Sequence, residues 1–402
     1  MQGLNLFMHL LRFLALLCIA TSAIAAPPGV TIAHSLASSQ RYLGAPSICI
    51  LPNGNYLASH HFFGPKSQEN RLPTGRVYRS QDHGESWKPI AEIKGFFWQN
   101  LFVFRGAVYA MGTDKQHGRL IIRRSTDGGE HWTKPTDATH GLLAEGEWHT
   151  APVPMVENDG RLWRAVEDAM NGTKWGERYR AHLMSMPLDA DPLNAASWTI
   201  SNPLARDPAW LGGDFAAWLE GNAVVTPEGK VVNLLRVDNS KLPEKAAIVR
   251  ATEPSTITFD PAKDFIDFPG GAKKFSIRKD PKSDGYWSLA TIIPEGSSLP
   301  AKTAPAAVRN TLALIHSNDL RAWEIRCVLL SHLDAEKHGF QYVDWQFEGN
   351  DLIAVCRTAW DDEEGGAHNF HDANFITFHR WKNFRQLSRK DDMPASVSAR
   401  SE

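Results

Sequence analysis

Short apolar segments separated by glycine turns recur along the whole chain. Each unit is a segment of strand length, a tight turn that contains glycine, and a second segment that ends in polar residues. The segments are too short for amphipathic helices, and they show no sustained 3.6-residue apolar period. The Asn-Gly, Asp-Gly and Glu-Gly turns favour hairpins, because glycine accepts the positive φ that a two-residue connection requires. Six copies are found, at residues 46–63, 96–114, 151–168, 221–238, 286–293 with 311–315, and 342–360.

The spacing of these hairpins predicts the architecture. Most units are roughly 50 to 60 residues long, which is close to the length of a propeller blade. We therefore expect an all-β protein, a six-bladed β-propeller. Seven blades stay open, because the irregular stretch 241–282 could hold another one. The segment 30–37 is expected to pair with 375–381, which would close the ring and remove exposed strand edges.

Composition agrees with this pattern and narrows the function. The 402 residues include 14 Trp, 30 Gly and 24 Pro, a combination typical of many short strands joined by turns. The formal net charge of −2 indicates neither a nucleic-acid partner nor a basic membrane-surface patch. Beyond the N-terminal region the cysteines Cys49, Cys327 and Cys356 lie in apolar segments, and an odd, widely spaced set favours buried thiols over a disulfide framework. We expect no cofactor and no metal, and the sequence does not predict the oligomeric state.

The first 25 residues have the features of a secretory signal. Arg12 precedes the apolar run 13–20, and Ala23-Ile24-Ala25 provides a cleavage site of small residues. The run is too short to span ~30 Å of hydrocarbon, and no comparable run follows, so no membrane span is predicted. The sequence thus predicts a signal peptide at 1–25, one domain at 26–402, and a secreted or periplasmic location.

A second repeated pattern follows several hairpins. The segments 80–87 and 125–132 both have the form S-x-D-x-G-x-x-W, and 317–323 is a shortened copy. This arrangement resembles the Asp box of sialidases and related propellers. Its aspartate is expected to accept hydrogen bonds from the turn amides, and its tryptophan to pack the turn onto the blade. Asp82 and Asp127 are therefore predicted to be structural.

The candidate site follows from the propeller itself. The innermost strand of each blade lines a central channel, so polar residues at the ends of these strands converge although they lie far apart in the sequence. The candidates obtained in this way are His60, His61, His149, Arg164, Glu167, Asp168, Glu220, Arg236, Asp238, Tyr286, Arg309, Tyr342, Asp344 and Arg357.

The resemblance to sialidases assigns roles to some of these residues. Glu220 and Arg236 are similar to the family's glutamate and second carboxylate-binding arginine, and Arg309 is similar to its third arginine. Tyr342 is similar to the tyrosine nucleophile. In the mechanism that this resemblance implies, glutamate activates tyrosine, a covalent glycosyl intermediate forms, and the arginines bind the substrate carboxylate.

The chain also departs from the sialidase pattern. The family's first hairpin opens with Arg-Ile-Pro, whereas this chain has Gly44-Ala45-Pro46, so one arginine is missing. The acid/base aspartate expected on the following loop has no clear counterpart among Ser67, Gln68, Glu69 and Asn70.

Histidines offer a second chemistry. Other sialidase-like propellers, including lyases and rhamnosidases that act on uronate-containing polysaccharides, use His with Tyr or Arg, since a neutral His can remove the proton α to a carboxylate. His60 and His149 are the candidates for this role, with Arg164, Arg357 and His371 as further substrate-binding candidates. The H-x-x-H spacing of His368 and His371 alone is weak evidence for a metal site.

Three functional classes follow. The first is a secreted, sialidase-like exo-glycosidase of an anionic glycan, which predicts Tyr342, Glu220, Arg236 and Arg309 around one pocket. The second is a lyase or rhamnosidase-type enzyme, which predicts His60 or His149 close to an Arg and a Tyr, with no glutamate beside Tyr342. The third is a non-catalytic glycan-binding propeller, which predicts a shallow aromatic surface.

Overall fold

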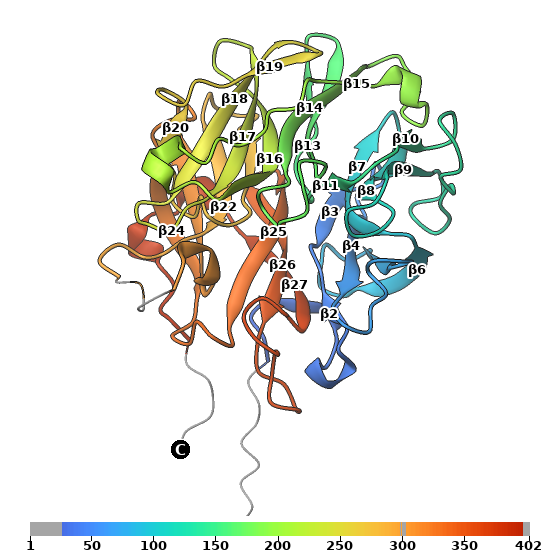
Figure 1. Ribbon diagram of the computed structural model, residues 1–402. Coiled ribbons are helices and arrows are strands. Elements are labelled where there is room, and N and C mark those ends of the chain that lie inside the picture. The colour runs from blue at the N-terminus through green and yellow to red at the C-terminus, as the bar shows by residue number, and fades with distance from the viewer. Residues whose placement is uncertain (1–25, 298, 300–302, 397–402) are drawn as a thin grey trace, which may run out of the picture.

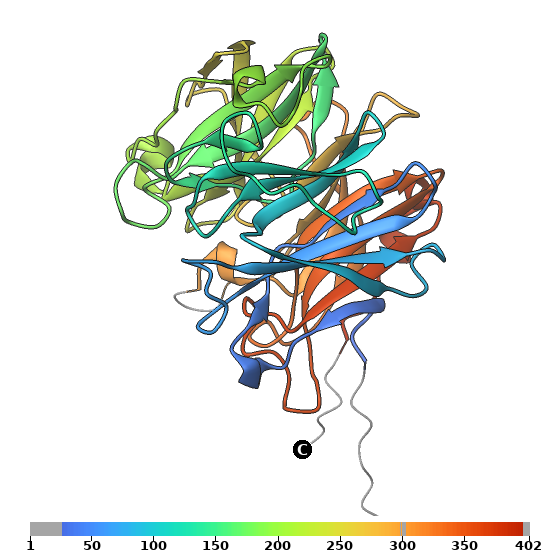
Figure 2. The ribbon, with the colours of Figure 1, turned by 90° about the vertical axis from the view of Figure 1, so that its right-hand side faces the viewer.

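Six antiparallel sheets surround a central channel in the computed structural model, which describes residues 26–297, 299 and 303–396. Figures 1 and 2 show the sheets following one another around the ring, with the N-terminal strand beside the C-terminal ones. The expected six-bladed propeller is confirmed. The predicted signal peptide lies outside the described residues.

Each sheet is one blade, and its strands follow chain order from the channel outward, apart from the last blade. Blade I contains β2 (Tyr42–Leu43), β3 (Ser47–Ile50), β4 (Tyr56–Phe63), β5 (Thr74–Ser80) and β6 (Lys88–Lys94). Blade II contains β7 (Phe97–Phe104), β8 (Ala107–Thr113), β9 (Leu120–Ser125) and β10 (Leu142–Ala144). Blade III contains β11 (Trp148–His149), β12 (Val156–Asn158), β13 (Arg161–Asp168), β14 (Arg180–Pro187) and β15 (Thr199–Ile200).

The second half of the chain repeats the arrangement. Blade IV contains β16 (Ala217–Val225), β17 (Val231–Asp238), β18 (Lys245–Glu253), β19 (Thr256–Thr258) and β20 (Phe265–Asp267). Blade V contains β21 (Ser276–Lys279), β22 (Tyr286–Thr291), β23 (Thr311–Ser317) and β24 (Glu324–Ser331). Blade VI contains β25 (Gly339–Glu348), β26 (Asp351–Ala359), β27 (Phe375–Trp381) and, as its outer strand, β1 (Val30–His34).

Helical structure in the described ranges is limited to short 3-10 turns. These are η1 (Ala37–Ser39), η2 (Ala195–Ser197), η3 (Trp210–Gly213), η4 (Pro305–Ala307), η5 (Phe384–Gln386) and η6 (Arg389–Asp391). No helix among the described residues is long and apolar enough to cross a membrane.

The ring closes through the first strand, as the sequence predicted. Strand β1 pairs antiparallel with β27, with Val30 opposite Phe378 and His34 opposite Phe375. The last blade is therefore completed by the beginning of the chain, and β27 is not left as an open edge.

One hairpin assignment from the sequence is corrected. The segments 286–293 and 311–315 form β22 and β23, which are the second and third strands of blade V, whereas its inner strand is β21. The irregular stretch 241–282 contains β18 to β20 of blade IV and then β21, so it holds no seventh blade.

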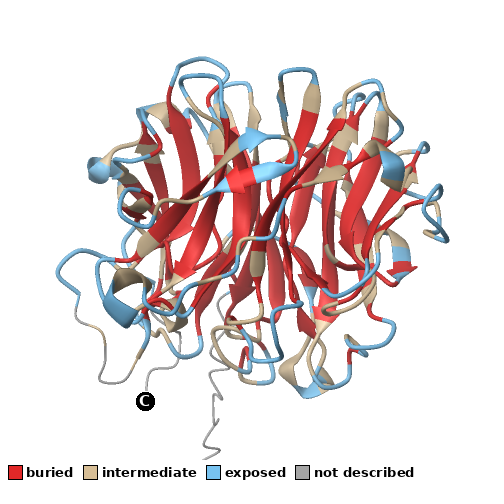
Figure 3. Cartoon of the chain, turned by 45° about the horizontal axis from the view of Figure 1, so that its top comes forward, coloured by how far each residue is buried: buried red, intermediate tan, exposed pale blue. Residues whose placement is uncertain are grey.

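Apolar side chains fill every interface between neighbouring blades. One cluster joins Leu234 of blade IV to Ile315 of blade V, and comparable clusters occupy the other interfaces. Figure 3 shows the strands buried and the connecting loops exposed. Because strands of both neighbours contribute to each cluster, the hydrophobic effect holds the blades together as well as forming them.

Buried polar side chains of the inner strands also join the blades. The Asp344 carboxylate on β25 accepts hydrogen bonds from the Ser47 hydroxyl (2.8 Å) and the Ile48 amide (3.0 Å) of blade I. The Ser47 hydroxyl oxygen in turn accepts from the Leu101 amide of blade II at 2.9 Å. These contacts give Asp344 a structural role.

The three S-x-D turns lie at the outer sides of the blades. Asp127 Oδ1 accepts hydrogen bonds from the amides of Glu130 (3.1 Å) and His131 (3.0 Å) and from the Ser125 hydroxyl (2.8 Å). Trp132 packs against the apolar cluster between blades I and II. The turns of Asp82 and Asp319 have the same kind of bonding, which is local to each turn.

Candidate functional site

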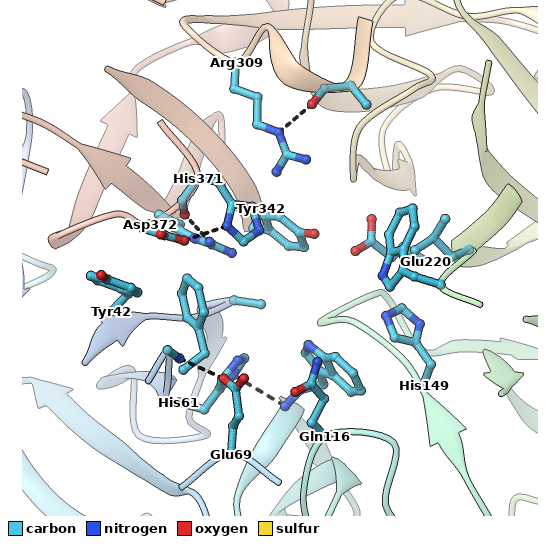
Figure 4. A pocket seen from close by; sticks show the side chains of 18 of the residues that line it. Tyr42, His61, Glu69, Gln116, His149, Glu220, Arg309, Tyr342, His371 and Asp372 are labelled. Carbon is cyan, nitrogen blue, oxygen red and sulfur yellow. Dashed lines mark hydrogen bonds and ion pairs between the residues drawn. The ribbon is translucent and has the colours of Figure 1, made fainter. Parts of the chain in front are cut away.

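A pocket of about 650 Å³ opens at one end of the central channel and receives side chains from all six blades. Figure 4 shows the labelled residues pointing into it from several strands. Seven of the nine residues to which the sequence assigned a catalytic or substrate-binding role line it. They are Glu220, His149, Tyr342, Arg236, Arg309, Arg357 and His371.

Three bulged inner strands aim side chains into the pocket. On β7, β16 and β25 the register slips by one residue, between Phe97 and Asn100, between Leu219 and Asn222, and between Gln341 and Asp344. The residues at the bulges are Trp98, Glu220 and Tyr342, with φ of 48°, 57° and 53°.

This backbone conformation is costly for any residue other than glycine. A left-handed non-glycine residue costs on the order of 1–3 kcal/mol, and such residues collect at functional sites. The bulges belong to blades II, IV and VI, so they alternate around the ring. The bulges bring Trp98, Glu220 and Tyr342 together at the same end of the channel.

The Tyr342 hydroxyl points toward the Glu220 carboxylate (Figure 4). Glu220 Oε2 accepts a hydrogen bond from Arg236 Nη1 at 2.8 Å, and these two side chains are only 3% and 2% exposed. Burial alone would raise the pKa of Glu220, but the charge of Arg236 and hydrogen bonds from Arg236 and Tyr342 outweigh it and lower that pKa. Glu220 is thus held as a carboxylate beside a phenol, which is the arrangement that a general base requires.

Two further arginines lie against the Tyr342 ring. The Cζ atoms of Arg309 and Arg357 lie 5.6 Å and 4.9 Å from its centroid. Arg309 donates to Gln341 Oε1 at 2.5 Å, and Arg357 donates to the carbonyl oxygen of His371. Burial lowers the pKa of Arg357 to about 10.

Not all donors of these arginines are used within the described part of the chain. The Nε atoms of Arg236 and Arg357 are buried without a hydrogen-bond partner there. Three guanidinium groups, two of them with an unused donor, make this side of the pocket suited to a carboxylate.

The opposite wall is aromatic and contains His149. Its ring lies 4.4 Å from that of Trp98 and 4.6 Å from that of Tyr179, centroid to centroid. His149 Nδ1 lies 3.1 Å from Glu167 Oε2. Trp175, which is 54% exposed, stands at the rim and packs edge-on against Tyr179.

His371 and Asp372 form a pair at the pocket wall. His371 Nδ1 lies 2.9 Å from Asp372 Oδ1, and His368 Nδ1 lies 2.7 Å from Asp372 Oδ2. Burial and the neighbouring Arg357 lower the pKa of His371 to about 4. His371 is therefore neutral over most of the pH range. In the described ranges no group of three or more His, Cys, Asp or Glu residues has the geometry of a metal site.

Glu69 also lines the pocket, although the sequence did not identify it as a functional residue. It lies on the loop after β4, where Oε2 accepts a hydrogen bond from the Gly64 amide at 2.8 Å. Burial, and to a smaller extent the charge of Asp372, raise its pKa. Its position on the loop expected to carry the acid/base residue was the available signal, but the expectation of an aspartate concealed it.

His61 also lines the pocket, although the sequence assigned it no catalytic or substrate-binding role. Its side chain occupies the space beside Gly44, where an added Cβ would lie 2.1 Å from His61 Nε2. His61 Nδ1 faces the Trp98 amide at 3.4 Å. With His61 in this place, residue 44 has no room for a side chain, and an imidazole stands where the resemblance placed the first arginine.

Two of the nine residues given a catalytic or substrate-binding role lie elsewhere. His60 does not line the pocket, because neighbouring residues of β4 face opposite ways, and its Nε2 lies 3.2 Å from the Tyr78 hydroxyl in the blade. Arg164 is buried in blade III, where Nη2 donates to Thr150 Oγ1 at 2.9 Å and to the Ala151 carbonyl at 3.2 Å. Both predictions of a place in the pocket are corrected by these contacts.

Comparison with solved structures identifies the fold. An α-L-arabinanase from Penicillium chrysogenum in complex with arabinobiose superposes with a TM-score of 0.56 at 13% identity, covering 89% of this chain and 98% of that one. A leech intramolecular trans-sialidase gives 0.56 at 10% identity, covering 90% and 71%. A Trypanosoma rangeli sialidase in complex with 2,3-difluorosialic acid, a covalent intermediate, gives a TM-score of 0.53 at 12% identity, covering 90% of this chain and 60% of that one.

Sequence comparison adds no closer relative. No protein-family model matches the chain, and no curated protein matches it. The similarity therefore lies in the three-dimensional arrangement, which these glycosidases share over about nine tenths of the present chain. The protein has the fold of the sialidase-like six-bladed β-propellers.

Proposed function

We propose that the protein is an exo-glycosidase that removes an anionic sugar from the end of a glycan and retains its stereochemistry. The observation that carries this proposal is the Tyr342 hydroxyl pointing toward Glu220, a buried carboxylate whose pKa is lowered beside Arg236. The similarity of the fold to those of glycosidases supports a carbohydrate-active enzyme in general, without specifying its substrate.

In the proposed reaction Glu220 takes the proton of the Tyr342 hydroxyl as the phenolate oxygen attacks the anomeric carbon. Glu69 protonates the leaving glycosidic oxygen, for which its raised pKa suits it. Water, deprotonated by Glu69, then attacks the covalent glycosyl-tyrosine, and Glu220 returns the proton to Tyr342. Every proton that leaves a residue in the first step returns in the second.

The arginines account for the anionic substrate. Arg236, Arg309 and Arg357 surround one side of Tyr342, and two of them have buried, unpaired Nε atoms. A carboxylate on the sugar would be bound by the charge of these guanidinium groups, which line the pocket. A volume of about 650 Å³ suits one terminal sugar residue better than a long chain.

Two alternatives receive less support. A lyase that uses His149 predicts no glutamate beside Tyr342, whereas Glu220 lies there. A non-catalytic binding propeller predicts a shallow aromatic surface, whereas the described residues form a pocket with a charged interior. Export from the cytoplasm is proposed from the sequence of residues 1–25 alone.

The test uses glycans ending in sialic or uronic acids and measures the sugar released. Tyr342→Phe should abolish release while still binding the free sugar, because only the nucleophilic oxygen is lost. Tyr78→Phe is the matched control, since its hydroxyl contacts His60 outside the pocket. Full turnover by Tyr342→Phe, or products with the ultraviolet absorbance of an unsaturated uronate, would reject the glycosidase mechanism.

A further inference from the structure

Two adjacent acidic residues at the end of β13 serve different neighbours. Glu167 and Asp168 are both 1% exposed, but successive side chains of a strand point to opposite faces. Asp168 contacts Arg180 Nε at 2.9 Å and His182 Nε2 at 2.7 Å, within the same blade. Glu167 instead contacts blade IV and His149, so a substitution at Asp168 is a suitable control for one at Glu167.

Glu167 joins two functional elements through its two oxygens. Oε1 accepts a hydrogen bond from the Gly221 amide of blade IV at 3.0 Å, and Oε2 lies 3.1 Å from His149 Nδ1. Gly221 directly follows Glu220 in the bulge of β16. One carboxylate therefore holds both the backbone that aims Glu220 and the imidazole beside it.

The bulge leaves little freedom at this point. A Cβ added to Gly221 would lie 2.0 Å from Asn233 Oδ1, so the backbone packs directly on its neighbour. Glu220 itself has a φ of 57°, which a glutamate adopts only when its surroundings impose it. The hydrogen bond from Gly221 to Glu167 is one such constraint.

The chemistry of Glu167 determines the proton position on His149. An ionised carboxylate only accepts hydrogen bonds, so the His149 nitrogen facing it, Nδ1, must carry the proton. In the neutral imidazole the other nitrogen, Nε2, then carries a lone pair. His149 lines the pocket between Trp98 and Tyr179, and within the described part of the chain no hydrogen bond to its Nε2 is formed.

We propose that Glu167 is a positioning residue that fixes the bulge of Glu220 and the tautomer of His149 together, so that His149 Nε2 accepts a hydrogen bond from a hydroxyl of the bound sugar. The identity of the occupant as a sugar rests on the proposed function. The carboxylate of that sugar lies toward the arginines, and its hydroxyl toward the aromatic wall.

Glu167→Gln tests this with a change of a single functional group. The Gly221 amide can only donate, so the new amide oxygen stays on Gly221 and the new NH₂ group faces His149 Nδ1. His149 must then accept at Nδ1 and carry its proton on Nε2, which presents a donor to the pocket in place of an acceptor. Loss of one well-placed hydrogen bond predicts a KM raised on the order of tenfold, with a smaller change in kcat.

The primary readout needs no ligand. In full-length protein with ¹⁵N-labelled histidine, His149 is assigned from the signal that disappears in His149→Ala. The wild type and Asp168→Asn should carry the proton on Nδ1, and Glu167→Gln on Nε2. A wild-type His149 protonated on Nε2 alone would overturn the proposal.

The kinetic readout is a double-mutant cycle on the glycan that the enzyme cleaves or, where none is cleaved, on the affinity for free N-acetylneuraminic and glucuronic acids. Glu167→Gln should raise KM in the wild type and leave it unchanged in His149→Ala. An equal rise in both backgrounds refutes the coupling. If Tyr342→Phe kept full turnover, the glycosidase mechanism would fail while the ring-nitrogen result still decided this proposal.

Discussion

Gly44→Ala tests whether the His61 side chain fills the space beside residue 44, where the sialidase pattern has an arginine. An added Cβ would lie 2.1 Å from Nε2, 2.4 Å from Cδ2 and 2.5 Å from Cε1 of the imidazole, whereas ordinary contact begins at 3.4 Å. The ring has little room to move back, because it packs 4.1 Å from the Phe97 ring, centroid to centroid, and its Nδ1 faces the Trp98 amide. A single methyl group must therefore displace His61, and with it Trp98.

The expected cost follows from this overlap. Overpacking a buried site destabilises a protein by about 1–3 kcal/mol, and we expect Gly44→Ala to lower the free energy of unfolding by that amount. His61→Ala removes a fully buried ring and should cost about 2–5 kcal/mol by leaving a cavity. In the double variant the methyl group of the new alanine enters the space vacated by His61. Its loss of unfolding free energy should therefore be smaller, by about 1–3 kcal/mol, than the sum of the losses of the two single variants.

Urea unfolding followed by tryptophan fluorescence measures these free energies, and binding of the free sugar measures the effect on the pocket. Gly44→Ala should also weaken binding, since Trp98 lines the site. An unfolding free energy within about 0.5 kcal/mol of the wild type would refute the reasoning. Strict additivity in the double variant would refute it as well.

Three further predictions concern the acid, the turns and the thiols. Glu69→Gln should lose activity on natural glycosides but keep it on aryl glycosides with good leaving groups. Burial raises the pKa of Glu69 above 4.5, so the wild-type kcat/KM should fall on the basic side of that pKa, and this fall should be absent in the variant. Asp82→Ala should lower Tm at neutral pH and leave the kinetics unchanged. Hydrogen bonds, the strongest from the Ser86 hydroxyl, lower the pKa of Asp82 from 3.8 to about 2, so the difference in Tm between variant and wild type should vanish as the pH falls from 4 to 2. Cys49 and Cys356 should not react with a thiol reagent until the protein unfolds, because both are buried and burial raises the pKa of Cys356 to about 12; rapid labelling of the native protein would contradict the structure.

The sequence alone determined the hairpins, the turns and the general architecture. These features are local: a two-residue turn requires glycine near the residues it connects, and an S-x-D turn forms its hydrogen bonds within a few residues. Ring closure through β1 was also predictable, since a propeller must pair its last blade. Blade V was misread because its inner strand β21 is short and follows an irregular stretch.

The tertiary structure decided which polar residues face the pocket. The choice of His61 over His60 depends on the direction of β4 relative to the channel, which the sequence does not specify. The bulge that aims Glu220 places a non-glycine residue at positive φ, a strain that only the packed ring can impose. Glu69 joins the site from a loop, whose path depends on distant neighbours such as Gln116. Each of these positions arises from contacts between residues far apart in the chain, and local pattern contains no information about them.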